Sequence, residues 1–245
     1  MKAFIIQARV GSTRLPNKIL LPFYNQQTII DLLLEKLKIF NLPIVIATST
    51  NAANDVLEEV AQRHNVKCFR GDEDNVLQRF ISAAESFGFD ELIRVCSDNP
   101  MLDASAIQHL ITVSDSRYDY ISFDVNGCPS IKTHFGFWTE YVTLNALRKV
   151  TNLTGEKLYH EHVTNYIYAH PNDFNIKWIN VDKSIACRTD LRTTIDTNED
   201  FCAIQTMYSE LVNSGTTSIS DIIAYADAHH QLLDQMKNQI IRNSK

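Results

Sequence analysis

The sequence predicts an α/β protein with a mostly parallel sheet and helices on both of its faces. Short apolar runs of strand type alternate with amphipathic stretches of helical spacing over the first half of the chain. The chain has 245 residues, of which 44% are hydrophobic, and it is therefore long enough to bury a large core. These two observations favour one large domain.

The alternation starts with an apolar run at residue 3 and continues to residue 123. Thr28 and Asp31 have the spacing of a helix-capping box, and the apolar residues that follow them recur at helical intervals. Predicted strands span residues 3–8, 43–48, 66–69, 91–96 and 118–123, and predicted helices span residues 28–39, 54–64, 75–87 and 104–114.

The pattern changes after residue 123, where Gly127, Pro129 and Gly136 interrupt it. We interpret residues 124–186 as an insertion, or acceptor and dimerisation region, within a single domain that spans residues 1–245. Predicted helices span residues 139–150, 156–169, 200–212 and 220–237, with a strand over residues 175–181. The aromatic residues expected in a core or at an interface are Phe135, Phe137, Trp138 and Tyr141. The two histidines expected to face solvent are His229 and His230.

Cysteine usage and hydropathy predict a cytoplasmic protein. The five cysteines are odd in number and form no CxxC pair, which indicates a reducing compartment and no zinc site. The apolar start of the chain is too short for a signal peptide, and no apolar run approaches the ~18 residues of a membrane span.

A cationic segment, residues 8–18, follows the first predicted strand. The first 30 residues contain four basic and no acidic side chains, so they carry +4, whereas the rest of the chain carries −10 to give the net charge of −6. Charge concentrated in this way favours a small, multiply phosphorylated ligand, because nucleic-acid binding normally requires a basic domain. We therefore expect no nucleic-acid partner.

The residue types of this segment suit phosphate. Gly11 lets a ligand approach the backbone, Ser12 supplies a hydroxyl donor, and Arg9 and Arg14 can each grip two phosphate oxygens. The segment is neither a Walker loop nor a GxGxxG motif, so binding has to rely on side chains more than on a glycine cradle. The alternative is a solvated loop with scattered cations.

Two aspartates also follow apolar segments. Asp98 follows ELIRVC, and Asp196 follows Ile195 in RTTIDTNED. Because ligands of open parallel sheets bind beyond the carboxyl ends of the strands, we expect these aspartates and the cationic segment to line one cleft. One or two carboxylates together with substrate phosphates commonly hold Mg²⁺. Alternatively, Asp98 is a turn residue and Asp196 a helix N-cap.

The segment QARVGSTRLPNK resembles the signature R-x-G-S-x-R-L-P-x-K of the cytidylyltransferases that make CMP-activated sugar acids, namely the CMP-Kdo synthetases and acylneuraminate cytidylyltransferases. The chain is more similar to the spore coat polysaccharide biosynthesis protein F branch of this family. Further matches to that branch are residues 69–80, 94–103, 160–167 and 192–201. They run in order across nearly the whole chain.

This resemblance implies a GT-A-like nucleotidyltransferase fold and transfer of CMP from CTP to a sugar-acid hydroxyl, with release of pyrophosphate. It implies that Asp98 and Asp196 bind Mg²⁺, and that Arg14 and Lys18 act with them in catalysis by stabilising the pyrophosphate. It implies that Arg9, Ser12, Arg14 and Lys18 hold the CTP phosphates and that Ala47, Thr48, Arg70 and Arg79 contact the base and ribose. The full set of nucleotide-binding residues is Ala8, Arg9, Gly11, Ser12, Lys18, Ala47, Thr48, Arg70 and Arg79. His160 and Trp138 depart from the branch pattern and leave the acceptor open.

The predicted helix over residues 156–169 is the candidate acceptor site. Lys157, His160, Glu161 and Thr164 have the spacing of one helix face, with His162 pointing elsewhere. A cation, an imidazole and a carboxylate on one face can bind an anionic acceptor and take up a hydroxyl proton, so His160 and Glu161 are predicted to contact the acceptor. The alternative is an ordinary exposed helix face.

Two other classes of function remain open. A GT-A glycosyltransferase would hold a sugar nucleotide through a DxD motif; Asp72 and Asp74 have that spacing, but in a loop. A non-catalytic nucleotide-binding module would bind CTP through cations alone and would not need both Asp98 and Asp196. For the enzyme we expect CTP and a small anionic acceptor as ligands, a homodimer, and a role in surface polysaccharide synthesis.

Overall fold

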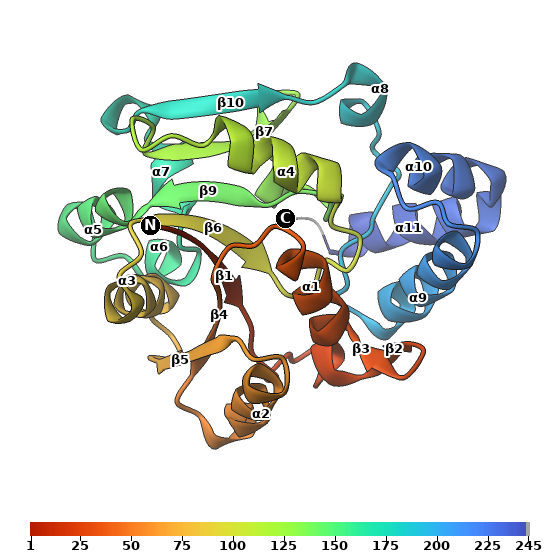
Figure 1. Cartoon of the computed structure of the whole chain (residues 1–245). Coiled ribbons are helices and arrows are strands. Elements are labelled where there is room, and N and C mark those ends of the chain that lie inside the picture. The colour runs from red at the N-terminus through yellow and green to blue at the C-terminus, as the bar shows by residue number, and fades with distance from the viewer. Residues whose placement is uncertain (244–245) are drawn as a thin grey trace.

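An eight-stranded sheet forms the centre of the computed structural model, which describes residues 1–243 (Figure 1). The strands are β1 (Lys2–Gln7), β4 (Ile44–Ser49), β5 (Lys67–Gly71), β6 (Glu91–Cys96), β7 (Tyr120–Val125), β8 (Cys128–Pro129), β9 (Glu140–Thr143) and β10 (Ile176–Asn180). Their order is β10-β7-β9-β6-β1-β4-β5, and β8 pairs with β7. The order is parallel except that β9 runs antiparallel to β6 and β7, and β8 antiparallel to β7. The predicted mostly parallel sheet is confirmed.

Helices cover both faces of this sheet, as predicted. The side chains of β1 show why, since Phe4 and Ile6 enter one apolar cluster while Ala3 and Ile5 enter the other. The first cluster contains residues of α1 (Ile29–Lys38), α2 (Asp55–Arg63), α4 (Ala104–Val113), α9 (Asn198–Asn213), α10 (Ile219–Ala228) and α11 (His230–Arg242). The second contains residues of α3 (Val76–Phe87), α5 (Leu144–Leu153) and α7 (Asn165–Ala169). The remaining strands and α-helices are the hairpin β2 (Pro22–Tyr24) and β3 (Gln27–Thr28), and the short helices α6 (Lys157–Glu161) and α8 (Lys183–Ala186).

Within residues 1–243, the helices α1, α9 and α10 begin at capping boxes. The hydroxyl of Thr28 accepts a bond from the backbone of Asp31, whose carboxylate accepts one in return, and α1 begins there as predicted. The same reciprocal pair, Thr197 and Asp200, starts α9 directly after Asp196. The capping box of α9 therefore fixes the chain beside one of the predicted site residues.

The helix predicted over residues 139–150 is wrong in its first turn. Residues 140–143 form β9 between β6 and β7, and α5 starts only at Leu144, capped by the Thr143 hydroxyl. All four strand residues are buried, with Tyr141 in one apolar cluster and Val142 in the other. The segment forms a strand because it inserts between two strands of the sheet. The sequence does not reveal this, because a strand buried on both faces has no polar side that would mark a period of two.

The predicted helix over residues 156–169 is broken. It consists of α6 and α7, joined through Val163 at a φ of 24°. The sequence predicted that Thr164 shares one helix face with Lys157. This is wrong, because Thr164 is fully buried whereas Lys157 is exposed. The helix predicted over residues 220–237 is likewise two helices, α10 and α11, that meet at His229.

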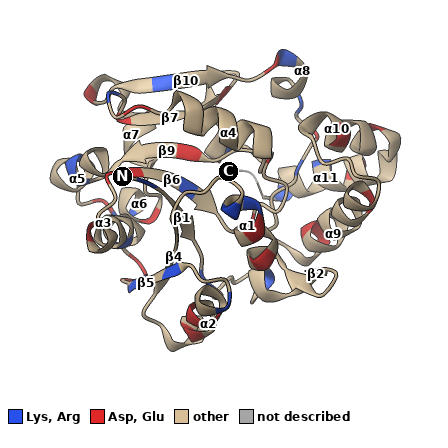
Figure 2. Ribbon diagram, in the orientation of Figure 1, with Lys and Arg blue, Asp and Glu red and all other residues tan. Residues whose placement is uncertain are grey.

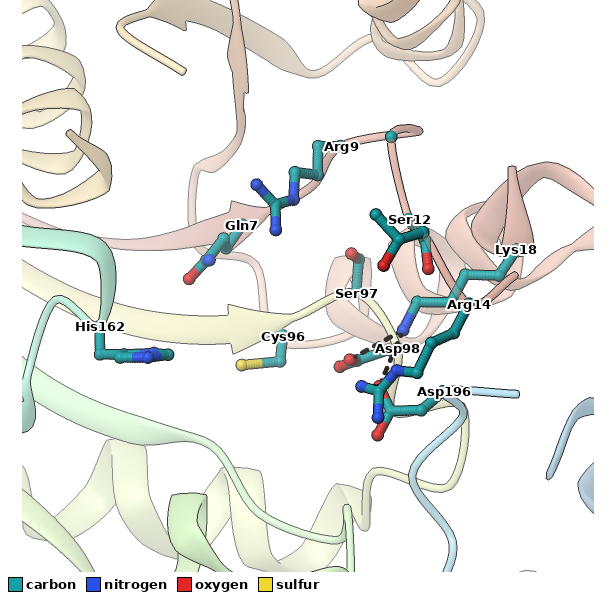
Figure 3. A pocket seen from close by; sticks show the side chains of 12 residues that line it. Gln7, Arg9, Ser12, Arg14, Lys18, Cys96, Ser97, Asp98, His162 and Asp196 are labelled. Carbon is teal, nitrogen blue, oxygen red and sulfur yellow. Dashed lines mark hydrogen bonds and ion pairs between the residues drawn. The ribbon is translucent and has the colours of Figure 1, made fainter. Parts of the chain in front are cut away.

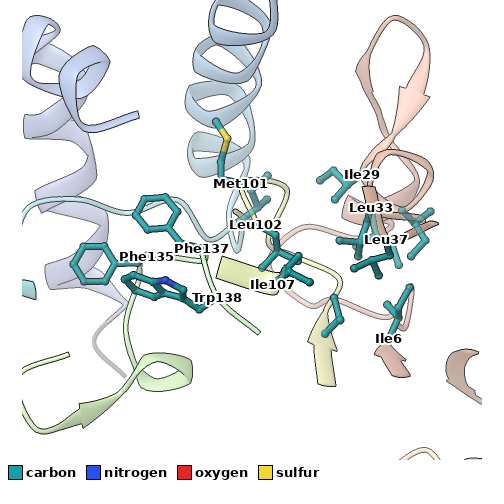
Figure 4. Packing of buried hydrophobic residues seen from close by; sticks show 14 of the residues in the cluster. Ile6, Ile29, Leu33, Leu37, Met101, Leu102, Ile107, Phe135, Phe137 and Trp138 are labelled. Carbon is teal, nitrogen blue, oxygen red and sulfur yellow. The ribbon is translucent and has the colours of Figure 1, made fainter. Parts of the chain in front are cut away.

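The aromatic side chains of residues 135–141 belong to the core. Phe135 stacks on Phe137, and both pack edge-on against Trp138, on the side of the sheet that also carries Met101 (Figure 4). The sequence predicted that these aromatic residues lie in the core or at an interface, and the core position is confirmed. His229 and His230 are exposed, as predicted. No helix within residues 1–243 is long and apolar enough to cross a membrane.

Candidate functional site

A cavity of about 340 Å³ lies at the carboxyl ends of β1 and β6 (Figure 3). Its lining residues are Gln7, Arg9, Gly11, Ser12, Thr13, Arg14, Lys18, Cys96, Ser97, Asp98, His162 and Asp196. We call it the first cavity. It brings together the predicted cationic segment and both predicted aspartates, at the edge of the sheet where open parallel sheets bind ligands.

The loop between β1 and Lys18 is tied to the neighbouring strand. The backbone N–H of Val10 donates to Oδ1 of buried Asn54 at 2.9 Å, and Nδ2 of Asn54 donates to the Ser49 hydroxyl at 2.7 Å. Asn17 adopts a left-handed backbone conformation, with φ of 58°, which asparagine tolerates well. This turn directs Lys18 back toward the sheet edge.

Lys18 joins the two predicted metal-binding aspartates. Its Nζ lies 3.2 Å from Oδ2 of Asp98 and 3.4 Å from Oδ1 of Asp196, and it donates to the carbonyl oxygen of Ile195 at 2.5 Å. The sequence predicted Lys18 as a phosphate ligand. In the structure its ammonium group balances the charge of the two carboxylates.

Asp196 has further cationic neighbours. Nη2 of Arg14 lies 2.9 Å from Oδ1, and Nη2 of Arg192 donates to Oδ2 at 2.9 Å. Arg192 is almost fully buried and also pairs with Asp200 at 2.8 and 2.9 Å. Burial would lower the pKa of Arg192, but its bonds with Asp200 and Asp196 raise the pKa above its usual value. The charged Arg192 thus fixes Asp196 at the cleft, a role that the sequence analysis did not assign.

The carboxylates fit a divalent cation. Asp98 and Asp196 already converge on one cationic nitrogen, and carboxylate oxygens are the ligands that Mg²⁺ prefers. Within residues 1–243 no group of three or more acidic, histidine or cysteine side chains could hold a metal ion. Phosphate oxygens of a substrate would therefore have to complete the coordination shell.

The residues predicted to contact base and ribose do not line the first cavity. Ala47 and Thr48 are fully buried in β4. Arg70 donates to the carbonyl oxygen of Ser49 and pairs with Asp55 at 2.6 Å. Arg79 donates to the carbonyl oxygens of residues 72 and 73 from a buried position. Both arginines hold protein loops in place.

A second cavity, of about 460 Å³, adjoins the first through Arg9. Its other lining residues are Asp72, Glu73, Asp74, Asn75, Lys157, His160 and Glu161. The predicted acceptor residues His160 and Glu161 therefore face a cavity opposite an acidic loop. Nε2 of His160 lies 3.0 Å from the carbonyl oxygen of Thr154.

The sequence predicted that His162 points away from the face of Lys157, His160 and Glu161, and His162 does line a different cavity from theirs; its place in the first cavity was not predicted. The helix break at Val163 turns the chain so that His162 no longer follows the face opposite His160. The signal was weak: the segment is rich in histidine, valine, threonine, tyrosine and asparagine, which favour helix only modestly. Gln7 was also missed, since a polar residue at the end of a strand is common.

The order of the strands and the position of the cleft at the edge of the sheet show that the protein has an α/β nucleotidyltransferase fold. The structure is similar to that of CMP:2-keto-3-deoxy-manno-octonic acid synthetase complexed with CTP, with a TM-score of 0.62 at 15% identity over 84% of this chain and 98% of that chain. It is also similar to a cytidylyltransferase from Leptospira borgpetersenii, with a TM-score of 0.82 at 26% identity over 95% of this chain and 96% of that chain.

The chain belongs to the cytidylyltransferase family, whose model matches residues 3–241. Among its relatives is the spore coat polysaccharide biosynthesis protein SpsF of Bacillus subtilis. That protein is 31% identical over 230 residues, which cover 90% of this chain and 91% of the relative. The family resemblance expected from the sequence motifs is confirmed.

Proposed function

We propose that this protein transfers CMP from CTP to a hydroxyl of a sugar acid or related acceptor, with release of pyrophosphate, in surface polysaccharide synthesis. The first cavity carries this proposal, because three cations, Arg9, Arg14 and Lys18, meet two convergent carboxylates there. The names of two similar proteins, one complexed with CTP and one of spore coat polysaccharide synthesis, support the nucleotide and the pathway.

The reaction needs no enzyme nucleophile. A bond forms between the acceptor oxygen and the α-phosphorus of CTP, while the bond to the bridging oxygen breaks and pyrophosphate leaves. Positioning and charge neutralisation can supply most of the rate acceleration in such a transfer. Arg9 and Arg14 would bind the phosphates, and Arg14 is half exposed and can reach the departing pyrophosphate.

Asp98 and Asp196 would hold Mg²⁺ together with the CTP phosphates. When bound, the ion supplies positive charge next to the α-phosphate and orients the reacting groups. Lys18 would then be released from at least one carboxylate and could turn to a phosphate oxygen, which reconciles its position in the structure with the role predicted from the sequence.

We infer that the nucleoside occupies the second cavity. Arg9 lines both cavities, so a nucleotide whose phosphates bind in the first cavity could extend past Arg9 and place its nucleoside in the second. The acidic side chains of residues 72–74 are hydrogen-bond acceptors, which suit the exocyclic amino group of cytosine. His160 and Glu161 would then face the nucleoside instead of the acceptor.

The glycosyltransferase alternative loses its motif in the structure. Oδ1 of Asp72 accepts bonds from the backbone N–H groups of Asp74 and Asn75, both at 2.8 Å. The DxD spacing therefore belongs to a turn that shapes the second cavity, and neither residue lines the first cavity with Asp98.

Pyrophosphate release tests the proposal. The protein is incubated with Mg²⁺ and each of CTP, UTP, GTP and ATP, against pools of sugar acids, neutral sugars and sugar phosphates. We expect release with CTP and a sugar-acid pool. CTP binding without release in every pool would favour a non-catalytic module, and sugar transfer from a nucleotide sugar would favour a glycosyltransferase.

A further inference from the structure

The amide of Gln7 has a defined orientation at the first cavity. Nε and Nη2 of Arg94 lie 3.3 and 2.9 Å from Oε1 of Gln7. A guanidinium group only donates hydrogen bonds, so the amide oxygen must face Arg94. In the part of the chain that the structure describes, Nε2 of Gln7 donates to no protein acceptor. The cavity therefore contains an amide donor available to a ligand (Figure 3).

A buried ion pair holds Arg94 in this position. Its Nη1 lies 2.5 Å from Oε1 of Glu140, both side chains are almost inaccessible, and the Tyr120 hydroxyl donates to the other oxygen of Glu140. Burial lowers the pKa of Arg94, but the charges of Cys96 and Glu140 raise it by more. The pKa therefore lies above its usual value, and the group stays charged. Figure 2 shows charged segments of opposite sign on the neighbouring strands β6 and β9.

The same pair anchors the segment that carries His162. The Thr164 hydroxyl donates to Oε1 of Glu140 at 2.8 Å and lies 3.4 Å from Nη1 of Arg94. Val163, which lies between His162 and Thr164 in the chain, is fully buried and has a φ of 24°. A β-branched residue adopts such a φ only where its surroundings enforce it. This turn places His162 at the side of the cavity opposite Asp196 (Figure 3).

We propose that Gln7 and His162 form the acceptor subsite, in which Nε2 of Gln7 donates to a carboxylate oxygen of the sugar acid. The Arg94–Glu140 pair and Thr164 act as positioning residues for both groups. The proposal rests on the cytidylyltransferase function proposed above, and it names the chemical group of the acceptor that the site reads.

The division of charge in the cavity supports this assignment. Arg14 and Lys18 lie with the two aspartates on one side, where a triphosphate would be neutralised. On the other side, Gln7 and His162 offer an amide and an imidazole away from the aspartates, and Arg9, which lines both cavities, lies near Gln7 (Figure 3). Such donors suit a single carboxylate. A sugar that presents no acceptor oxygen at this point would leave the amide unpaired, and a site built to bond a substrate group discriminates strongly against analogues that lack it.

The variant Gln7→Glu tests the role of the amide donor. A carboxylate keeps an oxygen for Arg94 and the shape of the side chain, but it replaces the donor with a negative oxygen. Pyrophosphate release is followed with Kdo and with N-acetylneuraminate as probes, and the Kd of CTP is measured by calorimetry. We expect the acceptor KM to rise at least tenfold while the Kd of CTP stays within twofold. Gln108→Glu, the same change on the exposed face of α4, is the matched control and should leave both values unchanged.

Thr164→Val tests the positioning role, because it removes the hydroxyl while keeping the shape. We expect a severalfold rise in the acceptor KM and an unchanged Kd of CTP. An unchanged acceptor KM in both variants would overturn the proposal, and so would equal weakening of CTP and acceptor in Gln7→Glu.

If neither probe is turned over, the side-chain amide resonance of Gln7, assigned by its loss in Gln7→Glu, gives the answer by NMR. A shift of this resonance when either acid is added to the CTP-bound protein supports the subsite, and no shift with either overturns it. Failure of the wild-type protein to bind CTP is a separate result, because it contradicts the proposed function itself.

Discussion

The two aspartates of the first cavity differ in how firmly the protein holds them. The Asp98 side chain is 33% exposed and contacts Lys18, whereas the Asp196 side chain is 12% exposed and contacts Lys18, Arg14 and Arg192. Asp196 therefore contributes both to the site and to the packing around α9. Asp98 is the cleaner probe of chemistry.

Replacing Asp98 by Asn should abolish turnover without unfolding the protein. The change removes a charge that would anchor the metal, and the loss of kcat should be on the order of 10²-fold or more if electrostatic stabilisation dominates. Steady-state pyrophosphate release and the Tm together check this. Asp234→Asn, at an exposed position of α11, is the control. A rate near that of the wild type with Mg²⁺ present would remove Asp98 from the mechanism.

Replacing Arg14 by Ala should weaken CTP more than CMP, because the proposed partners of this side chain are the β- and γ-phosphates. Arg14 is half exposed, so its loss should cost little stability. Titration calorimetry with both nucleotides measures the difference. Equal weakening of the two would place Arg14 at the α-phosphate or the nucleoside.

At the scale of elements, α1 supports the segment that follows β6. Nζ of Lys36 donates to the carbonyl oxygens of Pro100 and Leu102, at 3.4 and 2.6 Å. Burial lowers the pKa of Lys36 from 10.5 to about 8, although Asp103 acts in the opposite direction. The segment that carries Asp98 therefore rests on a lysine with a perturbed pKa.

This pKa predicts a pH dependence of the free energy of unfolding. The folded protein loses the Lys36 proton near pH 8, while the unfolded chain keeps it up to pH 10.5, so stability should rise with pH between these values. The gain should be on the order of 3 kcal/mol in total. Urea unfolding of the wild type and Lys36→Met at pH 7.5, 9 and 10 isolates this group. If the free energy of unfolding changes with pH by the same amount in the wild type and in Lys36→Met, the pKa of Lys36 is not lowered in the folded protein.

The elements that the sequence predicts well are those with a clear period or cap. The parallel strands up to β7 and the capping box of α1 were predicted because each lies in a local pattern. The strand β9 was not, because its place between β6 and β7 is set by distant residues. The breaks at Val163 and His229 likewise depend on packing that no local pattern records.

The site follows the same rule. Asp98, Asp196, Arg14 and Lys18 were placed together correctly, because the carboxyl ends of parallel strands share one edge. The partners of these residues were not predicted. Arg192 in particular lies in a recognisable motif, but its burial and its bond to Asp196 exist only in the folded chain.

At the scale of the molecule, the expected homodimer can be tested on residues 124–186. This segment carries three large apolar side chains at the surface, Leu153 at 46%, Leu158 at 52% and Trp178 at 38% exposed, the last on the edge strand β10. We expect a dimer in sedimentation velocity, shifted toward monomer by Leu158→Glu combined with Trp178→Glu. Leu153→Glu, also exposed, serves as a comparison within the segment. A wild-type protein that sediments as a monomer at all concentrations would contradict the expectation. The cytoplasmic location likewise stays a prediction from the sequence.

The first cavity is assembled from parts of unequal freedom. Its cationic loop and carboxylates are tied to the central strands, whereas His162 directly follows the short helix α6 and is held to the sheet through the bonds of Thr164. A lineage or an engineer could therefore replace His162, keeping Val163 and Thr164 as the fixed point, and leave the cationic loop and the two aspartates intact. Such a division lets one catalytic framework acquire new sugar substrates by changes in a single turn of chain.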